Sequence, residues 1–175
     1  AEMSVNGAEL IKAAGNTAAT AKSVGGVEIN AEKNGMAHFT AADDAACISD
    51  VKKLFALLPD NNLSGAPQVT CTDDLNRFES ALGSLTAEEN YDIKTAITAI
   101  ADNRAFLEVH AKYAPNLVCG FIRLNGVSVG VIANQNACEE GQLSRKACKK
   151  ATGFIRFCDA FNISVLTLTD TAGFV

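Results

Sequence analysis

The last residues of the chain hold its clearest candidate for a ligand contact. Asp170-Thr-Ala-Gly-Phe174 directly follows residues 163–169, whose β-branched side chains predict a strand. In open α/β folds, ligands bind beyond the carboxyl ends of the strands. Gly173 has no Cβ, so backbone N–H groups in this turn can point into a cleft. The simpler alternative is that Gly173 only turns the chain.

Histidines and cysteines offer few other reactive groups. His110 is a candidate general base because imidazole titrates near neutral pH, whereas His38 is more simply a structural histidine. The six cysteines, at positions 47, 71, 119, 138, 148 and 158, form no Cys-x-x-Cys and have no His at ligand spacing. We therefore expect no metal site. We expect reduced thiols in a cytoplasmic protein, with Cys47, Cys119 and Cys158 packed in the core.

The second half of the chain predicts the elements that must position the final turn. Residues 117–124 and 127–133 flank Asn125-Gly126, a strong signal for a type I′ β-hairpin. Apolar residues at intervals of three and four predict a helix over 143–161. Together with the strand at 163–169, the order strand, helix, strand implies a right-handed crossover and an α/β layer.

The first half has a weaker pattern. We expect a short helix at 7–14, extended pieces at 27–40 around an Asn34-Gly35 turn, and a helix at 41–58. A capping box, Thr40-x-x-Asp43, marks the start of this last helix. Its apolar side chains predict a face directed to the core: Cys47, Ile48, Val51, Leu54, Phe55 and Leu58.

Between the two halves lies the strongest break in the chain. Residues 59–70 contain two prolines, an Asn-Asn and a Ser-Gly, which predict a linker. Residues 71–85 are expected to be irregular. A second capping box, Thr86-x-x-Glu89, then predicts the start of a helix that continues through Ile100.

Composition limits the class of protein. The chain has 175 residues, of which 48% are hydrophobic and 20% charged, as in an ordinary globular domain. Its net charge is −5 and it has no long basic run, which disfavours a nucleic-acid partner. No apolar run approaches the roughly 18 to 20 residues that span a bilayer. Position 1 is not Met and no signal-peptide pattern is visible, so we expect the sequence to be a segment of a longer protein.

Several stretches resemble the carboxyltransferase subunit of biotin-dependent acyl-CoA carboxylases and decarboxylases. The most specific is the run Asn125 to Gln135, followed by Arg156-Phe-Cys-Asp-Ala-Phe-Asn-Ile163 and Asp170-Thr-Ala-Gly-Phe174. The stretch Gly26 to Asn61 resembles the segment that closes the N-terminal half of the family. The resemblance covers nearly the whole chain.

This resemblance implies an α/β fold of the ClpP/crotonase type, built from ββα units and containing parts of two repeats. Residues 1–58 would be the C-terminal part of the N half, and residues 59–70 the linker. Residues 71–175 would be the N-terminal part of the C half. In that family the active site lies between the N half of one subunit and the C half of another. We therefore expect uncovered apolar surface and association with further copies.

The resemblance also implies a chemistry for the final turn. The family moves a carboxyl group between carboxybiotin and an acyl-CoA, so negative charge develops on the thioester oxygen and on the biotin ureido oxygen. Backbone N–H groups at Gly173 and Phe174 are implied as catalytic donors to such an oxyanion. Ala172 and the pair Asn134-Gln135 are implied to contact the cofactor. Asn134-Gln135 could equally form an Asx-type cap and a solvated turn.

Other features of the resemblance refine these expectations. Thr171-Ala172 stands where the family commonly has Val-Pro, which leaves the fine geometry of the turn open. In that family, biotin is taken to remove the proton from the acyl-CoA, which argues against His110 as the base. The implied partners are a biotin carboxyl carrier protein or domain, a biotin carboxylase and other carboxyltransferase subunits. The direction, carboxylation or decarboxylation, is open. A non-catalytic crotonase-like module and a CoA-binding protein without biotin are the alternatives.

Overall fold

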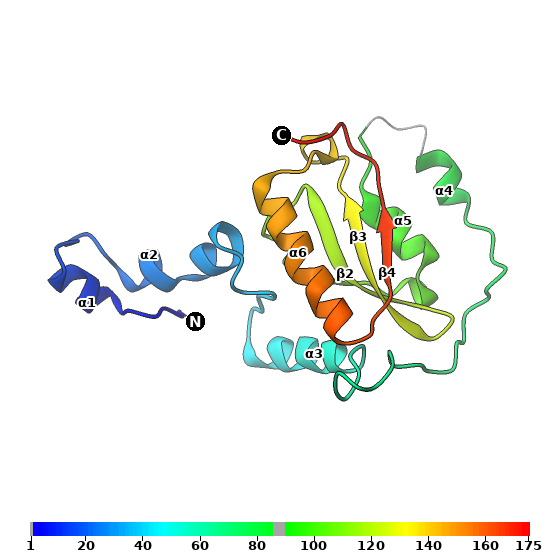
Figure 1. Cartoon of the computed structure of the whole chain (residues 1–175), viewed down its shortest axis with the longest axis horizontal. Coiled ribbons are helices and arrows are strands. Elements are labelled where there is room, and N and C mark those ends of the chain that lie inside the picture. Colours follow the sequence, from blue (N-terminus) through cyan, green and yellow to red (C-terminus); the bar gives the residue numbers. More distant parts are fainter. Residues whose placement is uncertain (1, 86–89) are drawn as a thin grey trace.

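A β-sheet with a helix on each face forms the body of the protein (Figure 1). The computed structural model describes residues 2–85 and 90–175, and within them the sheet has four strands in the order β1-β2-β3-β4. These strands are Leu107–Val109, Leu117–Leu124, Val127–Asn134 and Val165–Leu168. The pairs β1–β2 and β2–β3 are antiparallel, whereas β4 runs parallel to β3. The α/β class expected from the sequence is confirmed.

The β2–β3 hairpin turns at Asn125-Gly126, as predicted. Asn125 has φ 50° and Gly126 has φ 78°, and a type I′ turn requires positive φ at both positions. The buried carboxylate of Asp102 supports the turn, because it accepts hydrogen bonds from the N–H groups of Asn125 (3.1 Å) and Gly126 (2.6 Å). Asp102 begins a short 3-10 turn, Asp102–Arg104, that leads toward β1.

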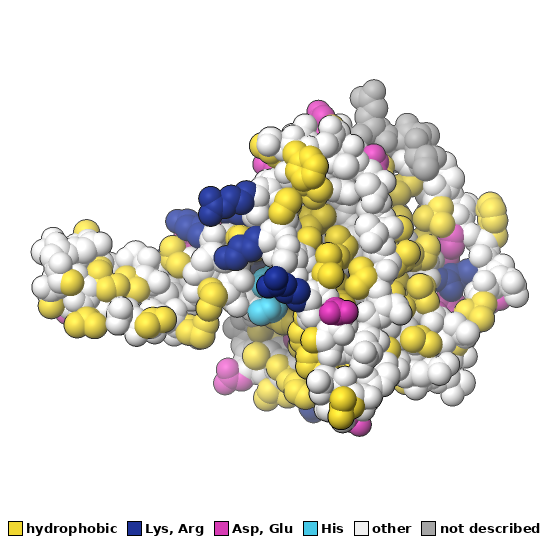
Figure 2. All heavy atoms as spheres, viewed as in Figure 1, with side chains coloured by type: hydrophobic (Ala, Val, Ile, Leu, Met, Phe, Trp, Pro, Cys, Tyr) yellow, Lys and Arg dark blue, Asp and Glu magenta, His cyan; other side chains and the backbone are white. Residues whose placement is uncertain are grey.

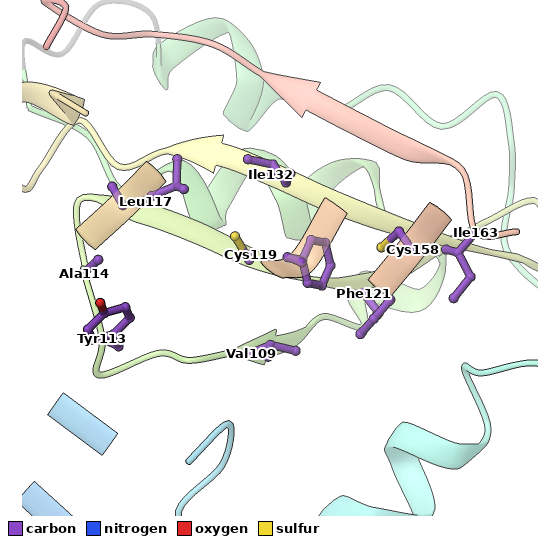
Figure 3. Packing of buried hydrophobic residues seen from close by; sticks show 11 residues of the cluster. Val109, Tyr113, Ala114, Leu117, Cys119, Phe121, Ile132, Cys158 and Ile163 are labelled. Atoms are coloured by element: carbon purple, nitrogen blue, oxygen red, sulfur yellow. The ribbon is translucent and has the colours of Figure 1, made fainter. Parts of the chain in front are cut away.

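Helix α6, Arg145–Ala160, connects β3 to β4 and confirms the predicted crossover. It begins after Ser144, whose hydroxyl accepts a hydrogen bond from the N–H of Ala147 (3.2 Å). We call the apolar residues between α6 and the sheet the α6-face cluster; Figure 3 labels nine of them, including Cys119, Phe121 and Cys158. The cluster has eleven buried members, and besides these three they are Val109, Tyr113, Ala114, Leu117, Ile132, Ala147, Phe154 and Ile163.

Helix α5, Ile93–Ile100, covers the opposite face of the sheet. Successive residues of a strand point to opposite faces, so Val118 and Ile122 of β2 pack with Ile97, while Cys119 and Phe121 face α6. The start of α5 is capped by Asp92, whose carboxylate accepts a hydrogen bond from the N–H of Lys94 (3.0 Å). The capping box predicted at Thr86 and Glu89 lies outside the described residues.

An N-terminal segment extends to one side of the body (Figure 1). It contains α1, Ala8–Ala13, and α2, Ala21–Gly25, followed by a π-helical segment, Glu28–Lys33. The extended pieces predicted over 27–40 are therefore wrong for 28–33. The side chain of Asn30 donates hydrogen bonds to the carbonyls of Met3 and Gly25, both at 2.9 Å. These contacts hold the helical conformation and involve residues far from Asn30 in sequence.

Helix α3, Asp44–Phe55, is shorter than the predicted helix at 41–58. Its cap is Asp43, which accepts a hydrogen bond from the N–H of Ala46 (2.8 Å), so the capping box beginning at Thr40 is wrong. A single carboxylate placed directly before the first turn satisfies that donor without Thr40.

Only part of the apolar face of α3 points to the core. Leu54 packs against the α6-face cluster, as do Leu57 and Leu58 after the helix. Ile48, Val51 and Phe55 are exposed. Cys47 is also exposed, which corrects its predicted place in the core. Helical periodicity identifies an apolar face, but it does not identify what covers that face.

Residues 59–70 run along the body rather than away from it. Gln68 forms an isolated bridge with Val127, and the side chain of Asn162 donates to the carbonyls of Asn62 (2.9 Å) and Ser64 (3.2 Å). The segment expected to be irregular over 71–85 forms helix α4 at Ser80–Leu85. The predicted boundaries of two half-domains stay predictions.

Within residues 2–85 and 90–175, no helix combines the length and the apolar character needed to cross a bilayer.

Candidate functional site

The turn at 170–174 lies beyond the carboxyl end of β4 and returns the chain toward the start of α6. The N–H of Leu143 donates to the carbonyl of Gly173 (2.8 Å), and the N–H of Val175 donates to the carbonyl of Leu143 (3.2 Å). The N–H of Ala172 donates to the carbonyl of Glu140 (3.3 Å), next to the 3-10 turn Glu139–Gly141. The turn is thus fastened on one side and lies at the edge of the sheet where the sequence places it.

Three backbone donors of this turn have no acceptor among the described residues: the N–H groups of Asp170, Thr171 and Phe174. Phe174 is the one that follows Gly173. The N–H of Gly173 donates to the hydroxyl of Thr171 (3.0 Å), but the N–H of Phe174 has no acceptor among the described residues. Gly173 has φ 123°, and no other part of the chain lies within 4 Å of the place a Cβ would occupy. The Phe174 side chain is 77% exposed. A free amide beside open space can therefore bind an external oxygen.

Asp170 holds the beginning of the turn. Its carboxylate accepts hydrogen bonds from the hydroxyl of Tyr91 (2.6 Å) and from the side-chain amide of Asn136 (3.3 Å). Burial, and secondarily the Asp170 carboxylate, raises the pKa of Tyr91 to about 12, so Tyr91 stays protonated and donates at neutral pH. Sequence reasoning missed Tyr91 and Asn136. Tyr91 and Asp170 are 79 residues apart, and no local pattern connects them.

Asn134 and Gln135 are buried and bonded to the protein, so they do not form a solvated turn. The side chain of Asn134 donates to the carbonyl of Gly141 (2.8 Å). The side chain of Gln135 donates to Asp92 (2.6 Å) and accepts from the N–H of Ile93 (3.1 Å), which ties β3 to the start of α5. Their contact with a cofactor stays a prediction. What the structure shows is that both side chains fix the segments around the 170–174 turn.

His38 and His110 lie together, away from this turn. Their ring centroids are 4.1 Å apart, and none of their described hydrogen bonds or ring contacts involves residues 170–174. Burial, followed by repulsion from His38 and Lys150, lowers the pKa of His110 to about 4. Burial also lowers the pKa of His38. The pair is therefore neutral at pH 7 and belongs to the packing between the 38–39 segment and the body.

Comparison with known families decides what this arrangement is. The model of the family described as "Carboxyl transferase domain" matches residues 1–175. The chain belongs to this family. The family resemblance found in the sequence is confirmed, and with it the crotonase-like fold.

Relatives of this carboxyl transferase domain act on acyl-CoA esters, according to their names. The chain is 40% identical over 184 residues to the propionyl-CoA carboxylase beta chain of Saccharopolyspora erythraea, covering 99% of this chain and 34% of the relative. It is 38% identical over 177 residues to the methylmalonyl-CoA decarboxylase subunit alpha of Veillonella parvula, covering 99% and 35%. The chain therefore spans about a third of the length of these relatives.

Solved structures agree with this assignment. The transcarboxylase 12S crystal structure with hydrolysed methylmalonyl-coenzyme A bound superimposes with a TM-score of 0.93 at 38% identity, covering 99% of this chain and 35% of that one. A single-chain, multi-domain long-chain acyl-CoA carboxylase superimposes with a TM-score of 0.80 at 24% identity, which supports the fold alone.

Two of the six thiols of the carboxyl transferase domain are structural. Cys119 and Cys158 are buried in the core, as predicted, and burial raises the pKa of Cys119 to about 12 and that of Cys158 to about 11. Both are therefore protonated and unreactive at neutral pH. In the part of the chain that the structure describes, no group of His, Cys, Asp and Glu has an arrangement that could hold a metal ion.

The histidine pair makes the stability of the carboxyl transferase domain depend on pH. The pKa of His110 is about 4 in the folded state, against an ordinary value of 6.5. Between these values the unfolded chain binds a proton that the folded chain does not, so stability is complete above pH 6.5 and falls as the pH drops toward 4. Because His110 is partly exposed, we expect a loss of only about 1–2 kcal/mol.

Urea unfolding at about pH 7 and about pH 5 measures this loss. His110→Asn is the matched variant, because Asn tolerates the positive φ of 56° at this position. The variant should lose most of the difference between the two pH values. An unchanged pH dependence in His110→Asn would assign the effect to other groups.

Proposed function

We propose that this chain forms part of an active site that moves a carboxyl group between carboxybiotin and an acyl-CoA. The relatives named above carboxylate or decarboxylate acyl-CoA esters, which supports this reaction class. The similar transcarboxylase 12S structure contains hydrolysed methylmalonyl-coenzyme A, which supports a short acyl group such as propionyl or methylmalonyl. Because the chain spans about a third of its relatives, the reaction belongs to the polypeptide that carries it.

The free N–H of Phe174 is the observation that carries this proposal. Loss of a proton from the α-carbon, or loss of the carboxyl group from the ureido nitrogen, places negative charge on a carbonyl oxygen. A fixed N–H donor stabilises that charge in the transition state. The bond from Gly173 to Thr171 and the anchors on Asp170 keep the donor in place, so little reorganisation accompanies the reaction.

The turn also fits the approach of biotin. Biotin, when bound, supplies the ureido ring that carries the carboxyl group. The space beside Gly173 leaves room for a carbonyl oxygen to reach the amide of Phe174, and the exposed ring of Phe174 can exclude water from it. Ala172 lies in the same turn. Asn134 and Gln135 would act mainly by holding the surrounding segments, through the bonds described above.

The direction of transfer and the partners belong to the same proposal. Similarity to a carboxylase and to a decarboxylase supports either direction. The reaction needs a biotin carboxyl carrier protein or domain, and carboxylation needs a biotin carboxylase to load it. The exposed apolar residues of α3, Ile48, Val51 and Phe55, are consistent with contact to other copies of the chain. A cytoplasmic location would place the enzyme with its CoA esters.

The decisive test is an exchange assay with the natural polypeptide that carries these residues. Labelled carboxybiotin on its carrier is mixed with propionyl-CoA, and label in methylmalonyl-CoA is measured. We expect transfer that depends on both reactants. Binding of propionyl-CoA without any transfer would instead support a CoA-binding protein without biotin, and the absence of both would support a non-catalytic module.

A further inference from the structure

A groove beside the start of α6 is lined by an excess of basic side chains. It has a volume of about 740 Å³ and lies between the π-helical segment, residues 112–116 and the first turns of α6. Two carboxylates line it, Glu32 and Glu139. Five basic side chains also line it: Lys33, Lys112, Arg145, Lys146 and Lys149. Figure 2 shows Lys and Arg side chains gathered where the N-terminal segment meets the body. This concentration contrasts with the net charge of −5.

Three of these cations have no carboxylate partner. Lys112 lies 3.8 Å from Glu32, and Lys33 pairs outside the groove with Glu28 at 3.0 Å. Among the described residues, no ion pair involves the other three: Arg145, Lys146 and Lys149. The ammonium of Lys146 lies 5.9 Å from the centre of the Tyr113 ring.

The placement of these charges costs stability in the absence of an anion. The first turn of α6 contains Arg145 and Lys146 and no acidic residue, although the N-terminal end of a helix carries partial positive charge. Side chains that oppose a local preference are expected mainly where they serve a function. The N–H groups of Arg145 and Lys146 also have no acceptor among the described residues.

Two backbone carbonyls in the wall of the groove at residues 112–116, those of Tyr113 and Asn116, accept hydrogen bonds from inside the protein. The ammonium of Lys150, on the buried side of α6, donates to the carbonyl of Tyr113 (2.9 Å) in this wall and to those of His110 (2.9 Å) and Leu117 (2.7 Å) on either side of it. The carbonyl of Asn116 accepts from the N–H of Gln135. These backbone oxygens are therefore engaged inside the protein rather than free in the groove.

We propose that this groove binds a diphosphate group of the kind carried by nucleotides. Phosphate oxygens match unpaired Arg and Lys side chains, and Arg can bind two of them at once. Coenzyme A and free nucleoside diphosphates both supply this chemistry. The coenzyme A source rests on the proposed function and the free nucleotide does not; because binding is measured directly and needs no turnover, the groove and the proposed carboxyl transfer can fail separately.

Calorimetric titration of the full chain with inorganic pyrophosphate tests the site. The variant Arg145→Gln/Lys149→Gln should bind pyrophosphate about tenfold more weakly or worse, since two charge-assisted contacts are lost. The control Lys22→Gln/Lys52→Gln changes the net charge equally and lies outside the groove, so it should bind like the original chain. In a ¹⁵N NMR titration, the amides of Arg145 and Lys146 should shift.

Parallel titrations with ADP and coenzyme A identify the source of the diphosphate. Tighter binding of coenzyme A than of ADP, lost in the groove variant, assigns the site to the thioester substrate; the reverse order assigns it to a free nucleotide. Equal weakening by the groove and control variants would mean general charge attraction and would overturn the proposal. So would pyrophosphate-induced shifts that leave Arg145 and Lys146 unaffected.

Discussion

Replacement of Phe174 by proline is expected to lower kcat for carboxyl transfer by about 10²–10³-fold, with little change in KM for the acyl-CoA. Proline has no N–H, so the variant removes the donor of the 170–174 turn that follows Gly173 and has no acceptor among the described residues. A donor that binds an oxygen only as it becomes negative contributes to the transition state and not to substrate binding. Its loss should therefore appear in kcat.

The surrounding contacts explain why so large an effect is expected from one amide. Thr171 accepts the N–H of Gly173, and Asp170 is held by Tyr91 and Asn136. The donor is thus fixed before the substrate arrives, and the adjacent N–H of Gly173 cannot replace it because that group already donates to Thr171. Water can replace a lost donor only at the cost of ordering in the site.

Phe174→Ala is the matched control, because it removes the ring and keeps the N–H. We expect it to retain most of kcat, and the ratio of the two variants isolates the amide. Steady-state kinetics in the natural polypeptide, with circular dichroism to confirm folding, provide the measurement. Equal activity of Phe174→Pro and Phe174→Ala would place the oxyanion donor elsewhere.

The parts of the fold that the sequence predicts are those determined by neighbouring residues. Asn125-Gly126 specifies the hairpin because few other pairs accept positive φ at both positions. The apolar residues of α6 at intervals of three and four specify its buried face, because Ala147, Phe154 and Cys158 all pack in the α6-face cluster. Gly173 and Phe174 are found at the carboxyl edge because this follows from the crossover alone.

The parts that the sequence does not predict depend on distant residues. The π-helical segment is held by bonds from Asn30 to Met3 and Gly25, and the final turn is held by Tyr91. Neither is visible in a local pattern. The exposed residues of α3 show the opposite problem, because an amphipathic pattern predicts burial without saying which partner supplies it.

Lys150 is the least predictable buried residue and the subject of the second prediction. We expect Lys150→Met to lower the free energy of unfolding by about 2–4 kcal/mol. A lysine in a helix pattern is expected at the surface, yet its side chain here is only 3% exposed. It has no carboxylate partner among the described residues and is satisfied by backbone carbonyls instead.

The carbonyls determine the size of the expected loss. Those of His110 and Ala114 also accept bonds from the N–H groups of Tyr113 and Leu117, so they keep a partner when the ammonium is removed. The carbonyl of Tyr113 has no other donor in the described residues. Burial lowers the pKa of Lys150, which shows that the ammonium itself is disfavoured there. Removing it therefore recovers part of the loss, and we expect less than the sum of its bonds.

Chemical unfolding at neutral pH compares Lys150→Met with Lys149→Met, which places the same side chain at the adjacent exposed position of α6. Lys149→Met should change stability by less than about 0.5 kcal/mol. The amides of residues 110–117 should also exchange faster with solvent in Lys150→Met, because the ammonium joins this loop to the helix. If both variants unfold alike, water already satisfies these carbonyls, and the loop, including the wall of the basic groove, is held by its apolar contacts instead.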